Sequence, residues 1–162
     1  YVIDGQFKAT DNFLKDVTDD KILFYVAETT LQLHMAESNE YVRDLYAAAY
    51  SMPNTMALIQ QKITGKHEEI FKEQLPDLET KDFFELEIAS GGIIRSFMTT
   101  PCDMYFTMER KVRRFIETTL LLYRVPNEKI NEAIDFVMQF DFVSFAEQTI
   151  EGMLKYLEKK TL

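Results

Sequence analysis

Residues that interrupt helices are rare in this chain, and that scarcity constrains its fold more than any other feature. Only four prolines and five glycines occur among 162 residues. Apolar side chains recur at three- and four-residue spacing almost throughout, and no stretch alternates strictly between apolar and polar residues as a half-buried strand does. The sequence therefore predicts an all-α fold, a compact bundle of about eight helices with short connections.

Capping residues and prolines divide this pattern into separate helices. The stretches at residues 18–20 and 38–40 stand where side chains commonly cap a helix start, and Pro53 suits a first helical turn. We expect helices near residues 1–15, 20–37, 40–51, 53–74, 80–99, 103–123, 127–139 and 141–159. The second of these is apolar on nearly all sides in its first half, which indicates a central, mostly buried helix.

The composition is typical of one folded domain from a reducing compartment. The chain is 46% hydrophobic and 13% aromatic, which is enough to bury a substantial core. We therefore expect residues 1–162 to form a single domain. The single cysteine, Cys102, cannot form an internal disulfide. No apolar run reaches the roughly 20 residues of a membrane span, so we expect a cytoplasmic protein with no membrane partner.

The charge balance argues against direct binding to nucleic acid. The chain carries 18 Lys and Arg against 27 Asp and Glu, a net charge of −9, whereas phosphate contacts need a basic surface. One basic run occupies residues 109–114, but Val112 within it belongs to the apolar side of its helix. We interpret the charges of this run as a solvent-exposed helix face.

The patterns that support catalysis or metal binding are missing. His34 and His67 are both preceded three residues earlier by a residue other than glutamate, which excludes the Glu-x-x-His pairs of a di-iron bundle. Phe71 stands where a zinc-protease motif beginning at His67 needs its second histidine. There is no glycine-rich phosphate loop, and Cys102 is interpreted as an ordinary thiol. We expect no enzyme activity, no catalytic residue, no metal and no cofactor.

His67 lies on the apolar stripe of its helix and has two interpretations. It is either a core histidine bonded to a carbonyl or carboxylate, or one of the few polar groups that orient a ligand in an apolar cavity. Tyrosines and methionines have the same two interpretations, core packing or cavity lining. Helix face and side-chain chemistry select these candidate ligand-binding residues: Tyr25, His34, Tyr46, Tyr50, Met56, His67 and Phe84.

Two adjacent glycines, Gly91 and Gly92, stand in the middle of the helix expected over residues 80–99. Each costs a helix interior roughly 1 kcal/mol relative to alanine, and the usual reason for accepting that cost is another backbone that comes close. Together with Ala89 and Ser90 they form a flat patch of small residues. An intrachain helix crossing, a kink and a dimer contact are all compatible with this spacing.

The order of residues resembles the effector-binding half of TetR/AcrR-type transcriptional regulators. The similarity is one of overall pattern, spans essentially the whole chain, and is carried by residues 41–46, 49–53, 71, 75–76, 82–83, 87–95, 101–106, 122–126 and 140–141. The resemblance implies a ligand-binding and dimerisation domain that follows an N-terminal helix-turn-helix domain. That domain is not in this chain, so operator DNA would be contacted only through the missing part.

The resemblance also implies an allosteric mechanism. In such regulators a small, hydrophobic effector enters a cavity among the first helices of this domain, and the change in dimer geometry lowers operator affinity. A homodimer is therefore expected, with these residues at its interface: Ala89, Gly91, Gly92, Phe145, Ile150 and Met153. Two other hypotheses stay open, a helical adaptor or structural bundle without a ligand and, less supported, a helical enzyme.

Overall fold

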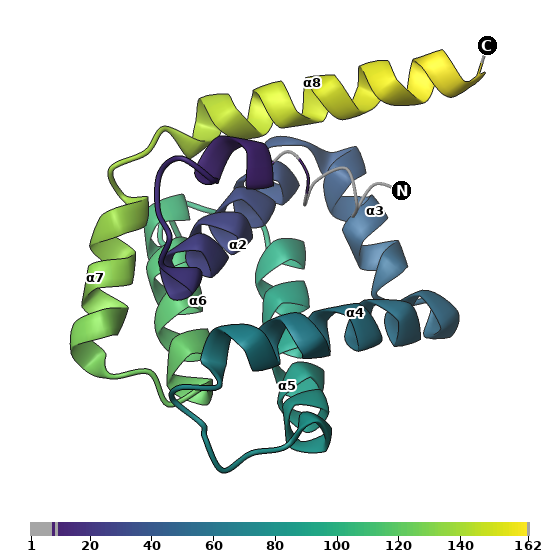
Figure 1. Ribbon diagram of the computed structural model, residues 1–162. Helices are drawn as coiled ribbons and strands as arrows, with labels where there is room; N and C mark the ends of the chain where they lie inside the picture. The colour runs from purple at the N-terminus through teal and green to yellow at the C-terminus, as the bar shows by residue number, and fades with distance from the viewer. Residues whose placement is uncertain (1–7, 9, 162) are drawn as a thin grey trace.

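Seven helices follow a short helical turn at residues 10–14 in this computed structural model, which describes residue 8 and residues 10–161 (Figure 1). The predicted all-α fold is confirmed, with no strand in the described part. Of the expected helix near residues 1–15, residue 8 and residues 10–14 are described and are helical, and residues 1–7 and 9 lie outside the described residues. The helices are α2 (Lys21–Ser38), α3 (Glu40–Ala49), α4 (Pro53–Phe71), α5 (Thr80–Thr99), α6 (Met108–Leu122), α7 (Asn127–Val137) and α8 (Phe142–Thr161).

The predicted caps begin two of these helices. Oδ1 of Asp20 accepts hydrogen bonds from the backbone N–H groups of Ile22 and Leu23 at the start of α2. Oδ1 of Asn39 accepts one from the N–H of Val42 at the start of α3. Each cap satisfies backbone donors that have no partner within the helix, which explains why local sequence predicted these boundaries.

The α2 helix is the centre of the bundle. It contacts every helix from α3 to α8, and its side chains are buried on nearly all sides, including Val26, Leu31 and Met35 with no exposed surface. This position confirms the prediction of a central helix. None of the described helices combines the length and apolar character that crossing a bilayer requires.

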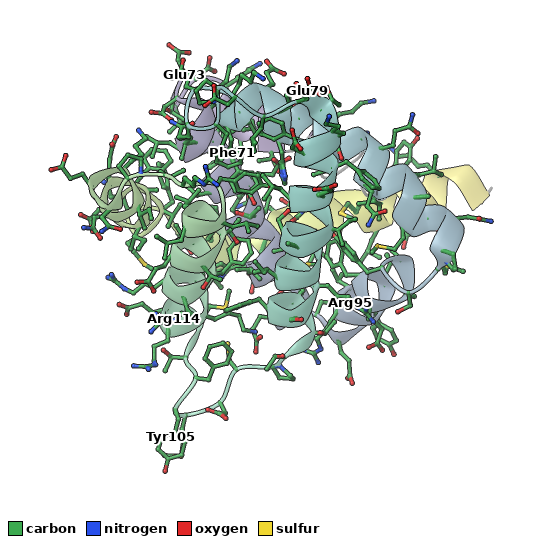
Figure 2. The ribbon with its side chains drawn as sticks, turned by 90° about the horizontal axis from the view of Figure 1, so that it is seen from below. Phe71, Glu73, Glu79, Arg95, Tyr105 and Arg114 are labelled. Atoms are coloured by element: carbon green, nitrogen blue, oxygen red, sulfur yellow. The ribbon has the colours of Figure 1, made fainter. Side chains whose placement is uncertain are left out.

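The α4 and α5 helices form an extensively packed neighbouring pair, and α5 also packs against α6. Phe71 at the end of α4 stacks on Tyr123 just after α6, with ring centroids 4.0 Å apart and an interplanar angle of 6°. Figure 2 shows Phe71 in the interior, whereas Glu73 and Glu79 of the α4–α5 connection lie at the edge. This stacking fixes the end of α4 against the core.

The start of α6 corrects a prediction. The sequence predicted a helix from residue 103, but α6 begins at Met108. Oδ1 of Asp103 accepts hydrogen bonds from the backbone N–H groups of Tyr105 and Phe106, at 2.8 and 2.7 Å. This side-chain-to-backbone turn competes with a helix for the same donors. Tyr105 therefore lies at the tip of a projecting loop (Figure 2) and is 79% exposed.

The basic run at residues 109–114 is only partly the solvent-exposed face that was predicted. Arg110, Arg113 and Arg114 are exposed, but Lys111 is completely buried. Its Nζ donates to Oε2 of Glu37 at 2.7 Å and to the backbone carbonyl of Thr100 at 2.6 Å. The prediction was wrong for Lys111, because a partner 74 residues away compensates for its burial.

The glycine pair does not seat another helix of this chain. A Cβ built at Gly92 would meet nothing within 4 Å, and one built at Gly91 would meet only Oε1 of Glu87, at 3.3 Å. Neither position touches a neighbouring backbone among the described residues, so the intrachain-crossing interpretation is wrong. Gly91 is buried and Gly92 is exposed, so the two glycines face different surroundings.

Candidate ligand cavity

A cavity of about 50 Å³ lies among α2, α3, α4 and α5. At 10–15 Å³ for each water, it has room for roughly three to five water molecules. Pockets for drug-sized ligands are larger, about 300–1,000 Å³. The wall is formed by Tyr25, Glu28, Thr29, Gln32, Tyr46, Tyr50, Ile59, Ile63, Lys66, His67, Glu87, Ser90, Gly91 and Ile94.

Four of the seven candidate ligand-binding residues line this cavity: Tyr25, Tyr46, Tyr50 and His67. The other three do not contribute to its wall. His34 stacks on Phe142 of α8, with ring centroids 5.7 Å apart. Phe84 is 43% exposed on the outside of α5, and Met56 lies half-buried on α4. The structure therefore brings together the tyrosines and the histidine of α2, α3 and α4.

His67 fits both interpretations of its position. Its Nδ1 lies 2.9 Å from Oε2 of Glu87 and 2.7 Å from Oη of Tyr123, and the histidine is 5% exposed. It is thus a buried histidine bonded to a carboxylate, and it also lines the cavity. Because Oε2 of Glu87 can only accept when ionised, Nδ1 carries a hydrogen in this arrangement.

Hydrogen bonds on the α5 side converge on one carboxylate oxygen. Oη of Tyr123 donates to Oγ of Ser90 at 3.1 Å, and Oγ of Ser90 donates to Oε2 of Glu87 at 2.8 Å. Burial raises the pKa of Tyr123, which outweighs the lowering by its bond to Ser90, so this hydroxyl stays a donor at neutral pH. The other Glu87 oxygen, Oε1, has no hydrogen-bond partner among the described residues.

The second buried carboxylate of the wall is fully paired. Nζ of Lys66 lies 2.8 Å from Oε1 and 2.6 Å from Oε2 of Glu28. Glu28 is 3% exposed, and its burial raises the pKa of this carboxyl despite the opposing effect of the Lys66 charge and hydrogen bond. The negative charge of Glu28 is therefore balanced by an ammonium group of the protein itself.

Three tyrosines supply aromatic surface and hydroxyl groups to the wall. Burial raises the pKa values of Tyr25, Tyr46 and Tyr50 above the ordinary value for tyrosine, so all three are neutral at physiological pH. The hydroxyls of Tyr25 and Tyr50 have no hydrogen-bond partner within the described part of the chain. The Tyr25 ring packs edge-on to His67, with centroids 5.2 Å apart.

Glu28, Glu87 and Gly91 belong to the wall but were not among the predicted ligand-binding residues. A spacing signal for Glu87 was present, because Phe83, Ser90 and Ile94 lie four residues before and three and seven residues after it, on the same buried helix face. Because carboxylates are ordinarily solvent-exposed, this spacing did not lead to a prediction that Glu87 is buried. Gly91 had been assigned to the dimer interface instead.

The six candidate interface residues do not form one surface. They divide between α5, which carries Ala89, Gly91 and Gly92, and α8, which carries Phe145, Ile150 and Met153. These two helices lie apart, with α2 between them (Figure 1). Gly91 and Ile150 are buried within the chain, whereas Ala89 and Gly92 are exposed. Only the outer face of α5 thus combines predicted interface residues with exposure.

Comparison with known proteins finds no protein-family model, curated protein or solved structure that matches this chain. Its function is therefore inferred from the cavity itself. Around a small, partly open volume, this site presents aromatic surface, one carboxylate oxygen and the hydroxyls of Tyr25 and Tyr50, polar atoms that have no hydrogen-bond partner among the described residues. Such a combination suits a compact ligand that forms both polar and apolar contacts.

Proposed function

We propose that this chain is a small-molecule-sensing domain whose ligand occupies the cavity among α2, α3, α4 and α5. The observation that carries the proposal is that Oε1 of Glu87 and the hydroxyl of Tyr25, on two nearly buried wall residues, form no hydrogen bond with the described residues. A ligand with hydrogen-bonding groups can use these polar atoms, as the few polar groups of a ligand pocket do. A structural bundle without a ligand does not require them.

We propose further that the domain belongs to a TetR-type transcriptional regulator, as the sequence resemblance implies. The position of the cavity supports this proposal, because α2 supplies four wall residues and also contacts α6, α7 and α8. A ligand that favours one position of α2 would favour the matching arrangement of the other helices. Operator DNA would be bound by the helix-turn-helix domain of the resemblance, and ligand binding would change its affinity.

The proposed regulator is a homodimer that pairs through the outer face of α5. Phe84 and Ile88 on this face are 43% and 51% exposed, and Ala89 and Gly92 beside them are also exposed. Open space over Gly92 allows another helix to approach closely. Exposed apolar side chains beside a flat position suit a helix-to-helix contact between two copies of the chain.

A thermal-shift screen of small compounds tests ligand binding, since a ligand that binds only the folded state raises the melting temperature. We expect compounds that raise it by several degrees in the wild type and fail to do so in Gly91→Leu, which fills the cavity wall. The matched control is Gly65→Leu, because Gly65 is exposed on α4 with nothing within 4 Å of a Cβ. The same shift in Gly91→Leu, or no stabilising compound, would contradict the proposal.

A further inference from the structure

We infer that the ligand of this cavity is a short, protonated alkylamine anchored by Oε1 of Glu87. This inference rests on the proposed function, because it names the chemistry of the molecule that the same cavity binds. It is carried by the pairing of the two buried carboxylates, the space beside Gly91, the aromatic wall and the cavity volume.

The two carboxylates of the wall differ in what they leave open. Both oxygens of Glu28 lie within 2.8 Å of Nζ of Lys66, so the charge of this carboxylate is already balanced within the protein. Glu87 is bonded through Oε2 alone, to Ser90 and His67, and its Oε1 has no partner among the described residues. The cavity therefore offers one open, anionic acceptor.

Burial makes that open oxygen selective. Glu87 is 3% exposed, so little bulk water reaches its carboxylate, and an ionised acceptor gains most from a donor that is itself charged. An ammonium group supplies both the hydrogen and the positive charge. A carboxylate ligand would instead place a second negative charge beside Glu87, and an alcohol would supply only the hydrogen.

Gly91 keeps the approach to this oxygen open. A Cβ at this position would lie 3.3 Å from Oε1 of Glu87, where any larger side chain occupies space that the ammonium group needs. The adjacent Gly92 has no such neighbour. The glycine at position 91 is thus explained by access to the carboxylate, although it weakens the helix.

The remaining wall suits an ammonium group on a short alkyl chain. Tyr25, Tyr46 and Tyr50 contribute aromatic rings, whose faces attract cations, most strongly where water is excluded. The hydroxyls of Tyr25 and Tyr50, which have no hydrogen-bond partner among the described residues, can accept N–H hydrogens. The volume of about 50 Å³ is about a third of a roughly 150 Å³ cavity that admits benzene, which limits the ligand to a few carbon atoms.

Isothermal titration calorimetry of the full chain with three probes of equal length tests the inference: propylammonium chloride, propan-1-ol and sodium propionate. We expect propylammonium to bind at least about tenfold more tightly than propanol, the effect of one charge-assisted hydrogen bond, and propionate not to bind. Glu87→Gln keeps the side-chain shape but removes the charge, and should weaken propylammonium binding at least about tenfold. The control Glu69→Gln removes a carboxylate whose side chain is 70% exposed, and should bind as the wild type does.

A second pair of variants serves if Glu87→Gln fails to fold. Gly91→Ala narrows the access to Oε1 and should weaken propylammonium binding, whereas Gly92→Ala should leave it unchanged. Tighter binding of propanol or propionate, or equal binding by both alanine variants, would overturn the amine inference and leave the sensing proposal standing. If propylammonium does not bind but the compound screen finds other ligands, the amine inference is overturned and the sensing proposal stands. Absence of any ligand in both experiments would overturn both.

Discussion

Gly91 and Gly92 are adjacent and identical, yet the fold gives them different neighbours. Gly91 is buried in the cavity wall beside a carboxylate, and Gly92 is exposed on the outside of α5. Helix propensity alone would treat the two positions alike. Any difference between equivalent substitutions therefore measures the surroundings of each residue, not the helix itself.

Alanine substitutions at the two positions should differ in stability. In the Ile88→Asp background, where the proposed dimer contact is absent, Gly92→Ala should raise the free energy of unfolding by about 0.5–1 kcal/mol, because alanine favours the helix and its Cβ meets nothing within the described chain. Gly91→Ala should gain less, because its Cβ lies 3.3 Å from Oε1 of Glu87 and the carboxylate must shift. Urea unfolding followed by circular dichroism measures both. A more stable Gly91→Ala would contradict this assignment.

Part of the cavity wall could be predicted from side-chain type. The rest depends on hydrogen bonds between residues of different helices, which the sequence does not reveal. His67 and Tyr25 were identified because a histidine and a tyrosine on apolar helix faces are typical of cavity walls. Glu87 was missed, since its burial depends on Ser90 and His67, and His67 lies on another helix. No local pattern in the sequence reports a bond between α4 and α5, so Glu87 was not among the candidate ligand-binding residues.

An ion pair between the buried Lys111 and the half-buried Glu37 joins α6 to the end of α2. Oε2 of Glu37 accepts from Nζ of Lys111, and Oε1 accepts from the backbone N–H of Cys102 at 3.0 Å. Burial alone would raise the pKa of Glu37, but these hydrogen bonds outweigh it and lower the pKa below its ordinary value. The pair therefore fixes the connection between α5 and α6 against α2.

Glu37→Gln should destabilise the protein by roughly 3 kcal/mol at neutral pH, because it leaves the buried Lys111 ammonium without its counter-charge. A carboxyl whose pKa is lowered by folding stabilises above its unfolded pKa, ordinarily 4.5, and this contribution is lost as pH falls through the folded pKa. The acid limb of a urea-unfolding series should thus be shallower in Glu37→Gln.

Glu109→Gln is the control for this pair, because Glu109 and Arg113 form an exposed ion pair on α6 whose loss should cost less than about 1 kcal/mol. Equal costs for the two variants would show that burial of Lys111 has no energetic consequence. Equal acid limbs in the wild type and Glu37→Gln would contradict the assigned direction of the Glu37 pKa.

Helix boundaries could be predicted wherever a local signal sets them. Asp20 and Asn39 cap their own helices, and α5 begins and ends within a residue or two of its expected range. The start of α6 was misplaced because Met104, Tyr105 and Phe106 fit a helical pattern of apolar residues. The turn around Asp103 prevents a helix from forming there, and the spacing of apolar residues gives no indication of such a turn.

At the scale of the whole molecule, the proposed dimer places the outer face of α5 at its centre. The chain has a mass of 19.0 kDa, so the wild type should sediment at twice that mass at micromolar concentration. Ile88→Asp should sediment as a monomer, because it places a charge in the middle of the apolar contact. Leu58→Asp on α4, where Leu58 is 68% exposed, should remain a dimer. A monomeric wild type would rule out the dimer.

The bundle architecture was the most predictable property of the whole chain. Few prolines and glycines and a nearly continuous helical periodicity predicted it, because these features act along the entire length. The cavity was less predictable, since its wall combines residues from four helices and its volume depends on how they pack. Three tyrosines and one histidine of the wall were predicted from side-chain chemistry. The charged residues of the wall, Glu28, Lys66 and Glu87, were identified only from the three-dimensional structure.

The central claim, that a small molecule binds among α2, α3, α4 and α5, is tested most directly by NMR with ¹⁵N-labelled glycine. Five glycines give at most five backbone amide signals, which are resolved by single-glycine variants. Titration with the compound that most raises the melting temperature should shift Gly91 saturably and leave Gly152, exposed on α8, unchanged. A Gly91 signal that stays in place while the compound reaches saturation would contradict the account.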